Sequence, residues 1–141
     1  MNIIDVAKQF ATEEACINYL EAMRWPEGVT CLKCGAKKVS RHQTAETSRQ
    51  RKNRKTGAME TKRVPARFIY QCNVTTCGHQ FSVTTGTVFH DTHLDLEKWF
   101  NAVALMCNAK KGLSALQMKR DLKVAYKTAW YLNHRIRKAT G

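Results

Sequence analysis

Apolar residues recur with helical spacing near the start of the chain. A first apolar set is followed by Thr12, whose hydroxyl can cap a helix that begins with Glu13 and Glu14. A second apolar set continues the pattern until Pro26 and Gly28 end it. We therefore predict helix within residues 2–25, with its apolar face packed on the module that follows.

Three more helices are predicted in the last third of the chain. The first begins behind Asp95, which can cap it. Ser114 and Gln117 have the spacing of a capping box, which opens a short second helix. The third runs from Tyr126 to about Lys138. The short turn between the last two helices predicts a helix-turn-helix, and a helical bundle without a DNA role is the alternative.

The middle of the chain alternates like strands. Residues 67–71 and 80–83 alternate apolar and polar positions, and residues 29–40 hold a turn and a short strand, which together predict about three antiparallel strands. Residues 41–66 contain almost no large apolar side chain. Composition predicts that this insertion is a mobile hairpin tip or loop outside any core.

Four cysteines stand in two pairs, Cys31 with Cys34 and Cys72 with Cys77, and glycine follows each pair. Glycine lets the chain turn so that backbone amides point at the sulfurs. Two such turns supply four soft ligands in a tetrahedron, the arrangement of structural zinc. Buried thiols or two disulfides are the alternative reading. The N-terminus does not resemble a secretory signal, so we expect a cytoplasmic, nucleoid-associated protein with reduced, metal-binding thiols.

The predicted fold is small α+β, with an N-terminal helical segment, a zinc-ribbon β module and a C-terminal helix-turn-helix. We expect three parts: residues 1–28, residues 29–93 with the basic insertion 41–66, and residues 94–141. Cys16 and Cys107 lie in apolar helical patterns and are expected to be buried structural thiols.

Charge is distributed unevenly along the chain, whose formal net charge is +13. Residues 1–30 hold two basic and five acidic side chains, whereas residues 31–71 hold twelve basic and two acidic ones. Such a surface attracts polyanions, and we expect double-stranded DNA as the partner. No apolar run is long enough to span a bilayer, so we expect no membrane association.

Two basic regions are the candidate DNA contacts. In the insertion they are Arg49, Arg51, Lys52, Arg54, Lys55, Lys62 and Arg63. In the third C-terminal helix they are Tyr126, Lys127, Thr128, Asn133, Arg135, Arg137 and Lys138. These residue types reach phosphates and base edges, and we expect them to be exposed.

Several blocks of the chain resemble bacterial insertion-sequence transposases that open with a zinc ribbon. The blocks are residues 12–16, 23–31, 81–94, 126–130 and 134–137. The resemblance covers nearly the whole chain and implies zinc, DNA binding and a recognition helix. In that family a ribonuclease-H-like domain follows, in which two aspartates and a glutamate hold Mg²⁺.

No acidic constellation of that kind is present up to Gly141, so we expect a protein that is not an enzyme. The leading hypothesis is an accessory subunit that adds DNA grip to a larger complex with a nuclease or transposase, in transposition or a CRISPR-type defence effector. A stand-alone sequence-specific regulator and the truncated front of an active transposase are the alternatives. Helix-turn-helix modules usually bind as pairs, so we also expect a homodimer.

Overall fold

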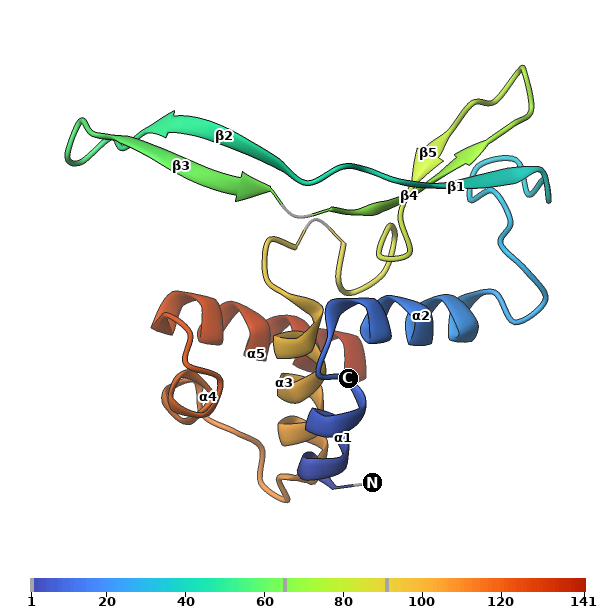
Figure 1. The fold of residues 1–141 in the computed structure, drawn as a ribbon. Helices are drawn as coiled ribbons and strands as arrows, with labels where there is room; N and C mark the ends of the chain where they lie inside the picture. Colours follow the sequence, from blue (N-terminus) through green and yellow to red (C-terminus); the bar gives the residue numbers. More distant parts are fainter. Residues whose placement is uncertain (1, 65, 91) are drawn as a thin grey trace. The chain divides into compact units, whose positions relative to one another are not determined.

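Five helices and two small antiparallel sheets make up the described part of the chain, residues 2–64, 66–90 and 92–141 of a computed structural model (Figure 1). The helices are α1 (Ile3–Gln9), α2 (Glu13–Arg24), α3 (Leu96–Asn108), α4 (Ala115–Leu122) and α5 (Tyr126–Thr140). The strands are β1 (Val39–Gln43), β2 (Thr47–Lys52), β3 (Met59–Val64), β4 (Phe68–Cys72) and β5 (Gln80–Phe81). Two compact units result: a helical unit, Met1–Pro26 with Val83–Gly141, and a β unit, Glu27–Ser82.

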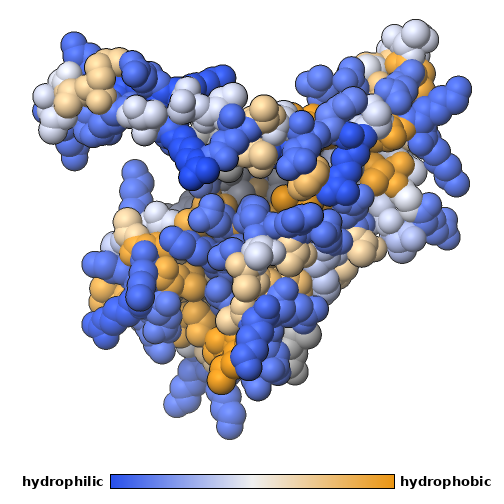
Figure 2. Space-filling model, viewed as in Figure 1, coloured by the Kyte–Doolittle hydropathy of each residue, from blue (hydrophilic) through white to orange (hydrophobic). Residues whose placement is uncertain are grey.

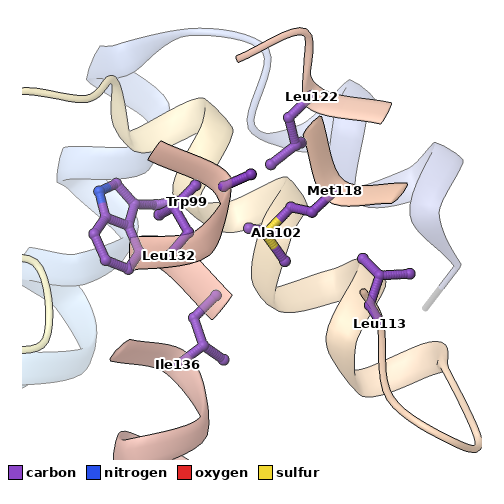
Figure 3. Packing of buried hydrophobic residues seen from close by; sticks show 8 residues of the cluster. Trp99, Ala102, Leu113, Met118, Leu122, Leu132 and Ile136 are labelled. Atoms are coloured by element: carbon purple, nitrogen blue, oxygen red, sulfur yellow. The ribbon is translucent and has the colours of Figure 1, made fainter. Parts of the chain in front are cut away.

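The core of the helical unit lies between α3, α4 and α5 (Figure 3). Its buried members are Trp99, Ala102, Leu113, Met118, Leu122, Ala129, Leu132 and Ile136. They come from all three helices and from the connection before α4, so the three helices share one core. Burying a large apolar side chain contributes about 1.5–3 kcal/mol, which makes this cluster the main stabilising element of the unit.

The N-terminal helices pack on α3. Val6, Phe10 and Cys16 form a second buried cluster with Leu96. The ring of Phe10 meets the ring of Phe100 edge to face, with 4.8 Å between centroids. The buried side chains of this segment therefore pack within the helical unit, against α3.

Helix caps follow the sequence signals in two of three cases. Thr12 Oγ1 accepts a hydrogen bond from the amide of Ala15 at 3.2 Å, and Ser114 Oγ accepts one from the amide of Gln117 at 3.2 Å. Both predicted cap hydroxyls are therefore confirmed, and of the capping box predicted at Ser114 the structure shows the half made by the serine. Asp95 precedes α3 as predicted, but its side chain makes no capping hydrogen bond.

A glutamate from another helix serves the start of α3 instead. Glu13 Oε2 accepts a hydrogen bond from the amide of Leu96 at 2.9 Å. Burial raises the pKa of the Glu13 carboxyl, as do the nearby charges of Asp95 and Glu97, while the Leu96 amide opposes the rise. The carboxylate thus links the first turns of α2 and α3 at a cost in desolvation.

The β unit contains both sheets. One has the strand order β1-β4-β5, with both pairings antiparallel, so the predicted three-stranded sheet is present. Tyr70 and Phe81 lie opposite each other in it and their rings stack at 5.6 Å. The second sheet pairs β2 with β3. Of the two forms predicted for residues 41–66, a hairpin tip or a loop outside any core, the structure shows the hairpin, and most of the insertion is paired strand.

Met118 offers a direct test of the helical core, because it is fully buried while Leu116 on the same helix is 54% exposed. We expect Met118→Ala to lower the free energy of unfolding by about 2–5 kcal/mol, as in other large-to-small core substitutions. Leu116→Ala should change it by about 0.5 kcal/mol or less. Thermal or urea unfolding followed by circular dichroism measures both, and equal effects would contradict the packing described.

Candidate metal centre and nucleic-acid interface

The four paired cysteines converge in the β unit. The Sγ atoms of Cys31, Cys34, Cys72 and Cys77 all lie within 4.8 Å of one another. The sulfurs of Cys31 and Cys77 are 3.7 Å apart, and those of Cys34 and Cys72 are 3.5 Å apart. A zinc ion with four sulfurs at about 2.3 Å in a tetrahedron places them about 3.8 Å from each other. The spacing therefore fits a metal ion held by four thiolates.

Two tight turns present these sulfurs. The amide of Gly35 donates to the carbonyl of Cys31 at 3.0 Å, and the amide of Gly78 donates to the carbonyl of Val74 at 3.1 Å. Both glycines have positive φ, 73° and 56°, which other residues adopt only with strain. The reason for a glycine after each cysteine pair is thus conformational, as the sequence predicted.

The first turn favours a thiolate at Cys31. The amide of Cys34 donates to its sulfur, and so does the amide of Lys33 at 3.4 Å; against the opposing effect of burial, these bonds lower the pKa of Cys31 to about 6. Amides aimed at a ligating sulfur are the usual outer shell of such a site. Part of the charge that a bound cation would need is therefore already favoured by the backbone.

In the second pair, the surroundings of Cys72 disfavour its thiolate form. The amide of Val74 lowers the pKa of Cys72, but burial and three adjacent sulfurs outweigh it and raise that pKa to about 12. Four thiols at this spacing resist joint ionisation, because each thiolate disfavours the next. A divalent cation at the centre removes the conflict by neutralising the charge of all four. The donor set is soft and closed, as structural zinc requires.

His79, the residue beside the second pair, takes no part in the cluster. Its carbonyl accepts a hydrogen bond from the amide of Cys72 at 3.0 Å, and its ring stacks on Phe81 with centroids 5.9 Å apart. Cys16 is buried as predicted, whereas Cys107 is exposed, so the expectation of a buried thiol there was wrong. Cys107 lies at the last turn of α3, past the stretch that packs on α5.

The candidate contacts of the insertion all lie in the β2–β3 hairpin. Arg49, Arg51 and Lys52 are on β2, Arg54 and Lys55 are in the turn, and Lys62 and Arg63 are on β3. All seven side chains are exposed. Figure 2 shows mostly hydrophilic side chains over this hairpin. Of the seven, Arg63 forms an ion pair with Glu46.

The candidate contacts on α5 do not share one face. Tyr126, Lys127, Arg137 and Lys138 are exposed, whereas Thr128 and Arg135 are half-buried. Arg135 donates to the hydroxyl of Tyr131 and, at 2.9 Å, to the carbonyl of His90. Arg137 donates to the carbonyl of Leu113 at 3.2 Å. Both arginines therefore also brace the helical unit.

Asn133 was predicted to reach DNA, and this prediction was wrong. Its side chain is 4% exposed, and its Nδ2 donates to the carbonyl of Leu113 at 2.8 Å. It lies on the buried face of α5 with Ala129, Leu132 and Ile136, at the spacing of a helical stripe. The helical spacing of Asn133 indicated a core position, but its polar side chain favoured a surface one in the sequence analysis.

Sequence reasoning also missed the aromatic residues that α5 exposes. Trp130 is 50% exposed and Tyr131 45% exposed, and the ring of Trp130 lies 4.1 Å from the ring of His134. Beside them a cleft of about 420 Å³ opens in the helical unit. Its lining residues are Thr92, His93, Leu94, Trp99, Lys127, Thr128, Tyr131 and Leu132. The cleft adjoins the N-terminal part of α5, where Lys127 lines it.

Comparison with known proteins agrees with this site. Residues 11–80 match the family model described as a transposase zinc-ribbon domain, of IS1595 type. The chain is 28% identical over 123 residues to an uncharacterized protein in the transposable element ISH50 of Halobacterium salinarum, a match that covers 87% of this chain and 34% of that protein. The chain thus spans about a third of this relative's length. No solved structure matches.

Residues 11–80 therefore carry a transposase-type zinc-ribbon domain, and the resemblance seen in the sequence is confirmed. The four clustered cysteines are consistent with zinc as its metal. Within residues 2–64, 66–90 and 92–141, no helix has the length and apolar character needed to cross a membrane.

Removal of a sulfur tests the metal centre. We expect Cys34→Ser to abolish stoichiometric zinc and to expose the amides of the β unit to hydrogen exchange, because so small a sheet needs the metal. Cys16→Ser should keep its zinc, since Cys16 lies in the apolar cluster of the helical unit. Elemental analysis and exchange mass spectrometry measure both effects. Equal zinc loss in the two variants would refute this ligand set.

Proposed function

We propose that this chain is a non-catalytic, zinc-stabilised protein of transposase descent that binds double-stranded DNA for a larger nucleoprotein complex. The observation that carries the proposal is that the zinc-ribbon match, the cysteine cluster and an exposed basic hairpin coincide in one β unit. Uncompensated cationic surface of this density is the usual footprint of a nucleic-acid partner. In this role the protein works in the cytoplasm, at the nucleoid.

Cys31, Cys34, Cys72 and Cys77 are the zinc ligands in this proposal. Four thiolates leave no open coordination position for water, so the ion has a structural role rather than a hydrolytic one. The zinc then fixes the strands of the β unit, and DNA contact is left to basic side chains that those strands and α5 carry.

The last two helices support a helix-turn-helix within the proposal. Helix α4 ends at Leu122, its C-cap Lys123 turns the chain with a φ of 53°, and α5 begins at Tyr126, two residues after Val124. This is the short connection of a recognition motif. Tyr126 and Lys127 are exposed at the start of α5, where such a helix meets base edges.

The proposed role is binding rather than strand cleavage. In the described part of the chain, the cysteine cluster is the one group of three or more His, Cys, Asp or Glu side chains placed to hold a metal ion. Cleavage by the two-metal route needs clustered carboxylates for Mg²⁺. We therefore assign catalysis to a protein partner of the nuclease or transposase class. A second copy of the chain is the other partner expected in this role, because paired recognition helices read longer sites.

A second candidate is the same DNA-binding role as the front part of an active transposase. The observation that favours it is the match to about a third of a longer transposable-element protein. A strand-nicking assay with Mg²⁺ separates the two candidates. Nicking by this chain, or by this chain joined to a downstream acidic-triad domain, would favour the transposase. The accessory role predicts no nicking by the chain itself.

Duplex binding and its salt dependence test the proposal. We expect the logarithm of the association constant to fall linearly with the logarithm of salt concentration, by about 0.9 per neutralised phosphate. Fluorescence anisotropy with a labelled duplex between about 50 and 200 mM salt measures this slope. Absence of binding at the lowest salt would refute a DNA-binding role.

Lys127 tests the recognition helix. On a duplex selected from a random library, Lys127→Ala should bind with about 1–3 kcal/mol less free energy than the original protein. On unselected duplexes the loss should be smaller. Lys138→Ala, an exposed lysine near the other end of α5, should weaken all duplexes alike, as a phosphate contact does. If Lys127→Ala also weakens all duplexes equally, α5 is a phosphate clamp and not a reader of bases.

A further inference from the structure

The β2–β3 hairpin is a built element. Its strands pair in an antiparallel register of six residue pairs, from Thr47 opposite Val64 to Lys52 opposite Met59. The turn is closed by the amide of Asn53, which donates to the carbonyl of Ala58 at 2.8 Å. Asn53 Oδ1 accepts from the amide of Lys55 at 2.9 Å, a side-chain bond typical of ordered turns. The basic residues are therefore held in fixed register and do not lie on a loose tail.

The hairpin is continuous with the strands that lead to the cysteines. Strand β1 pairs with β4, whose last residue is Cys72. Between the two strand pairs, Thr44 donates its amide to the carbonyl of Arg67 at 2.8 Å, and Thr44 Oγ1 accepts from the amide of Arg67 at 3.0 Å. Figure 1 shows the chain running from β1 into β2 along this path. The root of the hairpin is thus tied to the metal centre.

The two faces of the hairpin differ in how their charged side chains are paired. Paired residues share a face and alternate along the strands. We call face A the side with Thr47 and the pairs Arg49–Lys62 and Arg51–Glu60, and face B the side with the pairs Ser48–Arg63, Gln50–Thr61 and Lys52–Met59. Face A holds three cations and the carboxylate of Glu60, and face B holds two cations.

In the described residues the cations of face A form no ion pair, although Glu60 lies opposite Arg51 in the register. Arg49 stands directly opposite Lys62, a like-charge pair that destabilises an isolated hairpin. Glu60 accepts a hydrogen bond from Asn53 Nδ2 at 2.6 Å, and in the described residues no carboxylate forms an ion pair with the cations of face A. On face B, by contrast, Arg63 is paired with Glu46. Face A is the surface that a polyanion would stabilise.

The dimensions select one kind of polyanion surface. Six residues of strand extend about 20 Å, and two strands lie about 4.8 Å apart before side chains are added. The major groove of duplex DNA, about 12 Å wide, admits a two-stranded ribbon, whereas the minor groove, about 6 Å wide, does not without deformation. Arginine is the side chain that most often contacts guanine in the major groove.

We propose that the β2–β3 hairpin is a DNA-binding arm that lays face A into the major groove of duplex DNA, aimed by the metal centre at its root. The inference rests on the proposed function of duplex binding and adds an element, a face and a groove to it. Arg49, Arg51 and Lys62 contact the DNA, while the residues of face B point to solvent.

Two double variants of equal charge test the arm. Arg49→Gln with Lys62→Gln removes two cations from face A, and Lys52→Gln with Arg63→Gln removes two from face B. The face A variant should bind a duplex about ten-fold more weakly and flatten the salt slope by up to about 1.8, the loss of two phosphate-scale contacts. The face B variant should stay within about three-fold of the original protein. Equal losses in both variants overturn the arm and leave duplex binding standing.

Two single variants control for loss of binding that is caused by misfolding. Arg51→Gln and Lys52→Gln alter adjacent exposed residues on opposite faces of one strand. Both should keep their zinc and circular dichroism, and only Arg51→Gln should weaken binding appreciably. Equal binding by the two variants overturns the assignment of face A. Failure of the unaltered protein to bind any duplex overturns the proposed function and the arm together.

Dimethyl sulfate footprinting identifies the groove, because it methylates guanine N7 in the major groove and adenine N3 in the minor groove. The original protein should protect a set of guanines that the face A variant leaves reactive. Protection lost at adenines instead places the hairpin in the minor groove and refutes the groove assignment.

Discussion

Four sulfur atoms that resist joint ionisation are the constraint on which the β unit depends. Backbone amides lower the pKa of Cys31, whereas burial and neighbouring sulfurs raise that of Cys72. Only a cation at their centre makes four thiolates compatible at separations such as 3.5 and 3.7 Å. The metal then joins the turn before β1 to the end of β4, closing a long loop whose own residues bury little apolar surface.

That closure explains how a polar insertion can be ordered. Every side chain of β2 is exposed, as are those of Glu60 to Arg63 on β3, and a lone two-stranded hairpin is marginal in water. Hydrogen bonds between Thr44 and Arg67 connect the hairpin to the paired strands β1 and β4, and so help to fix its register. The helical unit has a different basis, a close-packed apolar core around Trp99 and Met118 that needs no metal. One unit therefore depends on zinc and the other on packing.

Features with a local physical signal were predictable from the sequence. Thr12 and Ser114 were found because a hydroxyl before a helix has a fixed role, and the cysteines because thiolate pairs followed by glycine have few other uses. The sequence favoured a hairpin tip or loop for this segment but not its strands, because every side chain of β2 is exposed and no alternation between apolar and polar positions marks it. Glu13 at the start of α3 depends on a contact between residues distant in sequence, which no local pattern contains.

X-ray absorption at the zinc edge tests the central claim most directly. The account predicts one zinc per chain with a first shell of four sulfurs at about 2.3 Å. A shell that contains nitrogen or oxygen at about 2.0–2.2 Å, or a folded β unit without any bound metal, would contradict it.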